Sequence, residues 1–76
     1  MVSVERLLQI TAASGLVADM GGFDPQRSFK DNGIDSLDVM TLLLGIEEDL
    51  GLKFSDEEVD RIRSLADVQA VLAARA

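Results

Sequence analysis

Apolar residues recur every three or four positions over most of the chain, which is the spacing of amphipathic α-helices. The pattern predicts four helices, over residues 3 to 16 or 17, 35 to 50, 56 to 62 and 65 to 74. The best strand candidate, "LKFS" at 52 to 55, is short and has no partner. We therefore expect an all-α fold, a small four-helix bundle with a long first loop and a short third helix.

Each predicted helix turns an apolar face toward a common core. The expected inward residues are Val4, Leu7, Leu8, Thr11 and Ala12, then Val39, Leu42, Leu43, Ile46 and Leu50, then Val59 and Ile62, and finally Leu65, Val68, Val71 and Leu72. The connection "ADMGGFDPQRSFKDNGI" at 18 to 34 is long for a compact domain, and such loops usually carry function or are pinned by buried side chains. Phe23 and Phe29 are the expected pins.

Capping signals mark where the helices begin and end. Asp35 is a good N-cap, and Asp38 favours the positive end of the helix dipole. Gly51 predicts the end of the second helix. The patterns "SDEE" from Ser55 and "SLAD" from Ser64 predict capping boxes at the third and fourth helices.

The second predicted helix is apolar on two sides. Beside its inward residues, it has a second stripe formed by Leu37, Met40 and Leu44. A surface helix needs only one apolar stripe to reach the core. Either this helix lies centrally and packs on both sides, or the second stripe stays partly exposed as a docking surface, flanked by Glu47 and Glu48.

The residue inventory excludes several classes of site. The 76 residues fit one domain, 1–76, and they include neither cysteine nor histidine. Disulfides, zinc–thiolate sites, thiol nucleophiles and a serine–histidine hydrolase within this chain are therefore excluded. A calcium loop that starts at Asp31 also fails, because its sixth and twelfth positions hold Ser36 and Leu42 instead of glycine and glutamate. We expect no metal site.

No apolar run approaches the roughly 20 residues that span a bilayer, and "MVSVERLLQI" is not a secretory signal. We expect a cytoplasmic monomer without membrane insertion. The formal charge is −7, but residues 31 to 60 hold ten acids and one base, whereas the other 46 residues carry +2. Such a field repels nucleic acid and anionic membranes and favours proteins with basic surfaces.

Local structure does not account for Ser36. The hydroxyl is permitted in the first turn but not required there, while Ile34 and Val39 are placed to form a hydrophobic staple around the cap. An anion esterified to Ser36 would lie beside unpaired backbone N–H groups at the positive end of the helix. A partner that docks on the second stripe would meet whatever the serine carries.

The segments "GIDSLDVMTLLLGIEEDLG" at 33 to 51 and "FSDEE" at 54 to 58 resemble the acyl carrier protein family, which includes peptidyl and aminoacyl carriers. The resemblance extends over essentially the whole chain. It implies that a separate magnesium-dependent phosphopantetheinyl transferase attaches 4′-phosphopantetheine from coenzyme A to Ser36. The missing cysteine is consistent with this, since any thioester then forms on the thiol of the arm. The chain would be a carrier and not an enzyme.

The resemblance also implies a surface for the transferase and for acyl-loading and acyl-processing enzymes with basic docking patches. The positions that match the family's recognition surface are Asp35, Leu37, Asp38, Met40, Leu44, Glu47, Glu48, Asp49, Asp56 and Glu57. Phe54 is counted with this recognition surface, where it either narrows the cleft between the second and third helices or is a core residue.

Four positions depart from the usual pattern of the fatty-acid carriers: Asn32, Thr41, Phe54 and Ser55. These departures point away from housekeeping fatty-acid synthesis and toward a specialised fatty-acid, lipid or polyketide pathway. Two alternatives stay open. One is an aminoacyl or peptidyl carrier of a nonribosomal-type pathway, and the other is an acidic helical adaptor that is never modified.

Overall fold

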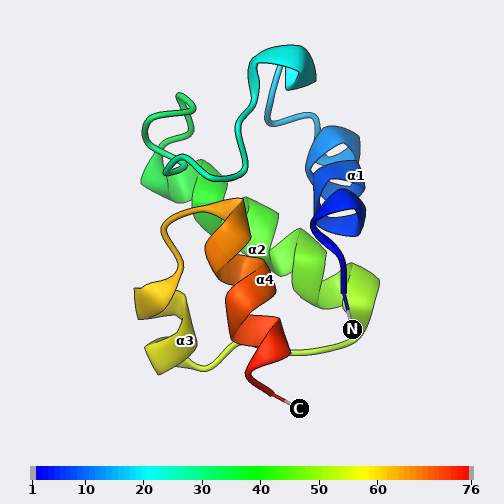
Figure 1. The fold of residues 1–76 in the computed structure, drawn as a ribbon, viewed down its shortest axis with the longest axis vertical. Coiled ribbons are helices and arrows are strands. Elements are labelled where there is room, and N and C mark those ends of the chain that lie inside the picture. The colour runs from blue at the N-terminus through cyan, green and yellow to red at the C-terminus, as the bar shows by residue number, and fades with distance from the viewer. Residues whose placement is uncertain (1, 76) are drawn as a thin grey trace.

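The computed structural model describes residues 2–75, and helices account for more than half of them (Figure 1). The elements are α1 (Val4–Ser14), the 3₁₀ turn η1 (Met20–Gly22), α2 (Ser36–Leu50), α3 (Asp56–Arg61) and α4 (Leu65–Ala73). Within residues 2–75 no strand forms, and one isolated bridge joins Ser28 to Ser64. The prediction of an all-α fold with a long first loop and a short third helix is confirmed.

The helices pack around α2 and α4. In Figure 1, α2 crosses behind α4, while α1 lies on one side of this pair and α3 on the other. α1 contacts both α2 and α4, and α3 contacts α4. None of the helices in the described part of the chain is long and apolar enough to cross a bilayer.

One cluster of apolar side chains forms the core. Its buried members are Leu7, Ile10, Phe29, Ile34, Leu42, Leu43, Ile46, Ile62, Leu65, Val68 and Val71. Of the predicted inward residues, Val4, Leu8, Val39, Leu50, Val59 and Leu72 are only partly buried. On α1, Ile10 is buried while Ala12 is exposed, because the inward face runs through residues 7, 10 and 11. Val59 is only half-buried, because α3 is a short helix at the surface.

Side-chain caps start the four α-helices. In each case a side-chain oxygen accepts the backbone N–H three residues later: Ser3 from Arg6, Asp35 from Asp38, Ser55 from Glu58 and Ser64 from Asp67. Gly15 ends α1 with φ of 73°, a left-handed conformation that glycine adopts at little cost. α1 therefore stops at Ser14, short of the predicted Leu16 or Val17.

The two predicted capping boxes differ. At Ser55 the box is complete, because Glu58 accepts the Ser55 N–H at 2.9 Å in return. At Ser64 the return bond comes from the preceding residue, since Asp67 accepts the N–H of Arg63 at 2.9 Å.

Buried side chains and backbone bonds hold the long loop between α1 and α2. Phe29 is 2% exposed, and Phe23 packs against the core cluster. The Phe29 N–H donates to the Arg63 carbonyl at 2.8 Å, and the Ala66 N–H donates to the Pro25 carbonyl at 3.0 Å. The loop is thus fastened to the start of α4.

Asn32 connects the two halves of that loop. Its Oδ1 accepts the Asp24 N–H at 2.9 Å, and its Nδ2 donates to the carbonyls of Asp24 at 2.8 Å and Ser28 at 3.0 Å. One side chain therefore satisfies several backbone groups that no helix or sheet pairs.

Candidate functional site

Ser36 occupies the first position of α2 and is exposed. The helix cap is made by its neighbour Asp35, whose Oδ1 accepts the Asp38 N–H at 2.9 Å. The chain contains six serines, and five of them use the hydroxyl in a local hydrogen bond with the backbone: Ser3, Ser14, Ser28, Ser55 and Ser64. Within residues 2–75 the Ser36 hydroxyl has no such partner. It is therefore available for chemistry.

An open groove of about 670 Å³ adjoins Ser36, and we call it the Ser36 groove. The core side chains Phe29, Ile34 and Ile62 line it, together with the half-buried Val39. The exposed serine and this apolar lining are parts of one recess. A group attached to the hydroxyl would thus start beside a surface suited to apolar chains.

The second stripe of α2 faces solvent. Leu37, Met40 and Leu44 are 78%, 48% and 56% exposed, whereas Leu42 and Leu43 are buried in the core. This exposure excludes the alternative in which α2 packs on both sides. Met40 also lines the Ser36 groove, so the stripe and the groove are continuous.

Asp35 and Asp38 form the cap at the start of α2, and the other five acidic residues expected to meet partners fall into two groups. One group is exposed and makes no ion pair within the described residues: Glu48, Asp56 and Glu57. The other group is engaged inside the domain. Asp49 of α2 pairs with Arg6 of α1, and the Glu47 carboxylate accepts the Phe54 N–H at 2.7 Å. Glu47 and Asp49 therefore hold elements of the fold together.

Phe54 is half-buried against the core and lies beneath Arg75. The guanidinium carbon of Arg75 is 5.6 Å from the centre of the Phe54 ring. Arg75 also donates to Glu58, with Nε 2.9 Å from Oε2 and Nη2 2.6 Å from Oε1. These contacts favour the core role for Phe54, because the ring is packed on one side and covered by a cation on the other.

The ion pair changes the acidity of Glu58. Hydrogen bonds from the Arg75 side chain, and next from the Ser55 N–H, lower the pKa of Glu58 from its usual 4.5 to about 2. The Glu58 carboxylate in turn raises the pKa of Arg75. The sequence prediction gave no role to Arg75, since its partner lies in a different helix.

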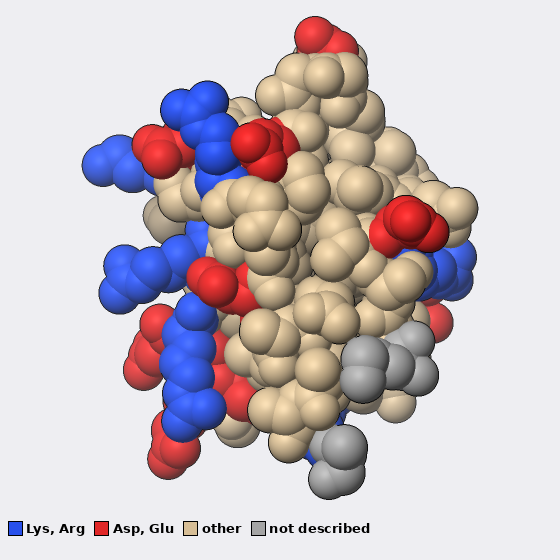
Figure 2. All heavy atoms as spheres, in the orientation of Figure 1, with Lys and Arg blue, Asp and Glu red and all other residues tan. Residues whose placement is uncertain are grey.

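Two basic residues of the Ser36 groove were also missed. Lys30 and Arg63 line it from separate loops. The signal that could have found them is their position, because they flank the acidic segment 31 to 60 at its two ends. Figure 2 shows basic side chains along the left side of the molecule in this view, with acidic side chains between them. Among the described residues, no three acidic side chains gather closely enough to hold a metal ion.

Comparison with known proteins identifies a matching family and related sequences. Residues 3–72 match the family described as "Phosphopantetheine attachment site", a span that includes Ser36. The chain is also similar to the "Acyl carrier protein, mitochondrial" of Dictyostelium discoideum, with 42% identity over 48 residues. That alignment covers 63% of this chain and 40% of the relative, so the chain spans less than half the length of the curated relative it matches.

Proposed function

The chain belongs to the acyl carrier protein family, and from this premise we propose that it carries acyl groups on 4′-phosphopantetheine attached to the Ser36 hydroxyl. The cofactor of this family is bound covalently, and its members are carriers that do not catalyse reactions themselves. When bound, the cofactor supplies a terminal thiol that holds acyl groups as thioesters. The chain itself has no cysteine.

The observation that most directly supports Ser36 as the attachment site is that its hydroxyl makes no hydrogen bond within residues 2–75. The other five serines are committed to local hydrogen bonds, whereas Asp35 caps α2 and leaves Ser36 exposed without a partner in the described chain. The residues fit the cofactor electrostatically as well. A phosphodiester on Ser36 would lie at the positive end of a 15-residue helix, beside backbone N–H groups that have no partner within the helix.

Mass spectrometry tests this proposal. The purified chain is incubated with coenzyme A, magnesium and a broad-specificity phosphopantetheinyl transferase. We expect the mass to increase by one phosphopantetheine group and the Ser36→Ala variant to stay unmodified. Ser55→Ala is the matched control, because Ser55 is also exposed at a helix start but uses its hydroxyl as a cap. This control should still gain one group.

An unchanged mass of the wild-type chain would contradict the proposal. The unmodified acidic adaptor would then be the better description. If the chain gains the group and Ser36→Ala also gains it, the carrier function stands but the attachment site is wrong.

We further propose that partner enzymes dock on the second stripe and on the exposed acids beside it. The stripe adjoins the Ser36 groove through Met40, and the exposed, unpaired acids are Glu48, Asp56 and Glu57. An apolar strip with charge at its rim is typical of protein interfaces. Glu48→Lys should raise the KM of the transferase for this chain. Glu5→Lys makes the same charge change at an exposed position of a different helix, α1, and should leave that KM unchanged.

The cargo and the compartment are also proposals. We propose a specialised fatty-acid, lipid or polyketide pathway, on the basis of the departures at Asn32, Thr41, Phe54 and Ser55. Aminoacyl loading is the alternative, and mass analysis of the loaded chain isolated from its own cells distinguishes the two. We keep the cytoplasm as the predicted location. The relative named as mitochondrial supplies the competing location, which imaging of a tagged chain in its native host decides.

A further inference from the structure

Two basic side chains occupy the same recess as Ser36. Lys30 and Arg63 line the Ser36 groove, and the backbones that carry them are joined. The N–H of Phe29, the residue before Lys30, donates to the carbonyl of Arg63 at 2.8 Å, and a bridge links Ser28 to Ser64. The fold therefore holds the two segments that carry these cations together at the groove that Ser36 also lines.

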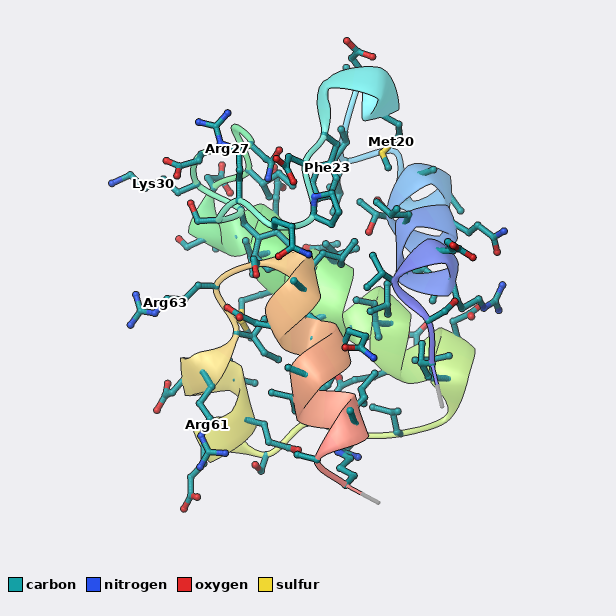
Figure 3. All side chains as sticks on the ribbon, in the orientation of Figure 1. Met20, Phe23, Arg27, Lys30, Arg61 and Arg63 are labelled. Atoms are coloured by element: carbon teal, nitrogen blue, oxygen red, sulfur yellow. The ribbon has the colours of Figure 1, made fainter. Side chains whose placement is uncertain are left out.

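In the described part of the chain, neither cation is occupied by an ion pair, so both can bind an anion. The ion pairs found among residues 2–75 use Arg6 and Arg75, so neither Lys30 nor Arg63 is neutralised by one. Figure 3 shows their side chains extending toward solvent from the same side of the molecule, as those of Arg27 and Arg61 do. Only Lys30 and Arg63 of these four line the groove.

The acids nearest to these cations in the sequence are engaged or exposed. Asp67 accepts the backbone N–H of Arg63, and Asp35 accepts that of Asp38. Asp31, next to Lys30, and Asp60, three residues before Arg63, are exposed. A group on Ser36 would thus enter a recess with acidic neighbours on the α2 side and two free cations on the loop side.

We propose that Lys30 and Arg63 bind the phosphodiester that joins the cofactor to Ser36, and so hold the first part of the arm over the Ser36 groove. This inference rests on the proposed attachment at Ser36. The phosphodiester adds one negative charge next to Asp35 and Asp38, and the two cations oppose that repulsion. Both side chains are long and flexible, and the arginine fork matches two phosphate oxygens while the lysine acts as a point charge.

The arm then has a preferred direction. Contact with Lys30 and Arg63 draws it across the apolar lining formed by Phe29, Ile34 and Ile62 and away from the acidic rim of α2. A partner with a basic surface would compete for the same phosphodiester. The two cations therefore position the arm in the free carrier and do not take part in any reaction.

The test observes the phosphodiester of the modified full chain by phosphorus NMR. The reference is the same modified chain unfolded in urea, where the group is free. We expect the folded protein to show a shifted and broader signal at low salt. The double variant Lys30→Gln/Arg63→Gln should move this signal toward the urea reference. Added salt should do the same to the wild-type signal, because it screens exposed charges.

The matched control is the double variant Arg27→Gln/Arg61→Gln. It removes the same charge from the same side of the molecule but not from the groove. Its signal should stay at the wild-type position. Identical spectra for the two double variants, or a wild-type signal that does not respond to salt, would overturn the inference. If the groove double variant unfolds, the two single variants and the wild-type salt series decide the question.

The two failures are distinguishable. A chain that gains no phosphopantetheine fails the mass test, and the proposed function fails with it. A chain that gains the group but gives equal spectra for both double variants is still a carrier, and only the role of Lys30 and Arg63 is then refuted.

Discussion

The carboxylate of Glu47 accepts a hydrogen bond of 2.7 Å from the backbone N–H of Phe54. The sequence assigned both residues to partner recognition, yet the structure bonds them to each other. The bond ties the last turns of α2 to the segment that leads into α3. Gly51 allows the chain to reverse between them, with φ of 67°. Glu48, one residue further, is exposed and has no such bond within residues 2–75.

Glu47→Ala should therefore destabilise the domain, whereas Glu48→Ala should not. The first change leaves the part-buried N–H of Phe54 without its acceptor, and we expect it to lower the free energy of unfolding by about 1 to 2 kcal/mol. The second change should stay within about 0.5 kcal/mol, as is usual at exposed positions. Urea denaturation of both variants measures the difference.

Glu47→Gln separates the structural role from the charge. Glutamine keeps an acceptor oxygen, so we expect it to recover most of the stability lost in Glu47→Ala. If the two variants of Glu47 are equally unstable, the negative charge and not the hydrogen bond is what matters. A loss of partner affinity in Glu47→Ala alone would not identify a docking contact, because the α2–α3 connection changes too.

Asn32 should be needed for the order of the long loop. Asn32→Leu replaces the amide with an apolar side chain and removes the bonds to both backbone groups of Asp24 and to Ser28. We expect a loss of about 1 to 3 kcal/mol, because these groups lose their partners, together with faster amide exchange across residues 23 to 33. Hydrogen-exchange NMR and urea denaturation measure both effects.

Asn32→Asp and Gln26→Leu are the controls for this loop. The aspartate keeps the acceptor for the Asp24 N–H but loses the donors, so its stability should be intermediate. Gln26 is exposed in the same loop, and its replacement by leucine should have little effect. A fully stable Asn32→Leu would mean that leucine packing replaces the hydrogen bonds, and the departure at Asn32 would then have no structural cost.

Two glycines, one inside α2 and one at its C-terminal cap, should respond in opposite directions. Gly45 lies inside α2, and an added Cβ there meets no atom within 4 Å, so Gly45→Ala should raise the free energy of unfolding by about 0.5 to 1 kcal/mol. Gly51 has φ of +67°, so Gly51→Ala should lower it by about 1 to 2 kcal/mol. Thermal unfolding of both variants measures whether each is more or less stable than wild type. A change in the same direction for both would contradict this prediction.

The parts of the fold that follow from local chemistry were predictable. Asp35, Ser55 and Gly51 act within a few residues, and the predicted limits of α2, α3 and α4 differ from the observed ones by about one residue. The end of α1 was placed too late because the predicted helix continued through Gly15, whose left-handed conformation ends it. Periodicity alone also could not decide between Ile10 and Ala12 as the inward residue of α1.

The candidate site was predictable only in part. The sequence identified Ser36 and the second stripe, because a cap at Asp35 and a surplus of apolar positions on α2 are visible in one helix. The sequence could not predict the hydrogen bond between Glu47 and Phe54 or the ion pair between Arg75 and Glu58, because both depend on how separate elements pack. Lys30 and Arg63 meet at the groove for the same reason, through the attachment of the long loop to the start of α4.

The Glu58–Arg75 ion pair should make the domain less stable in acid. The pKa of Glu58 is about 2 in the folded chain and near 4.5 when the group is free, so folding favours its deprotonated form. Its contribution is therefore complete above about pH 5 and is lost as the pH falls toward 2. Glu58→Gln should be less stable than wild type at neutral pH, and the gap should close near pH 2. Urea denaturation across this pH range measures it. Glu57→Gln, at the exposed neighbouring residue without an ion pair in the described chain, should follow the wild-type curve. If the free energy of unfolding of Glu58→Gln differs from that of wild type by the same amount at every pH, ionisation of Glu58 is not the cause of the difference.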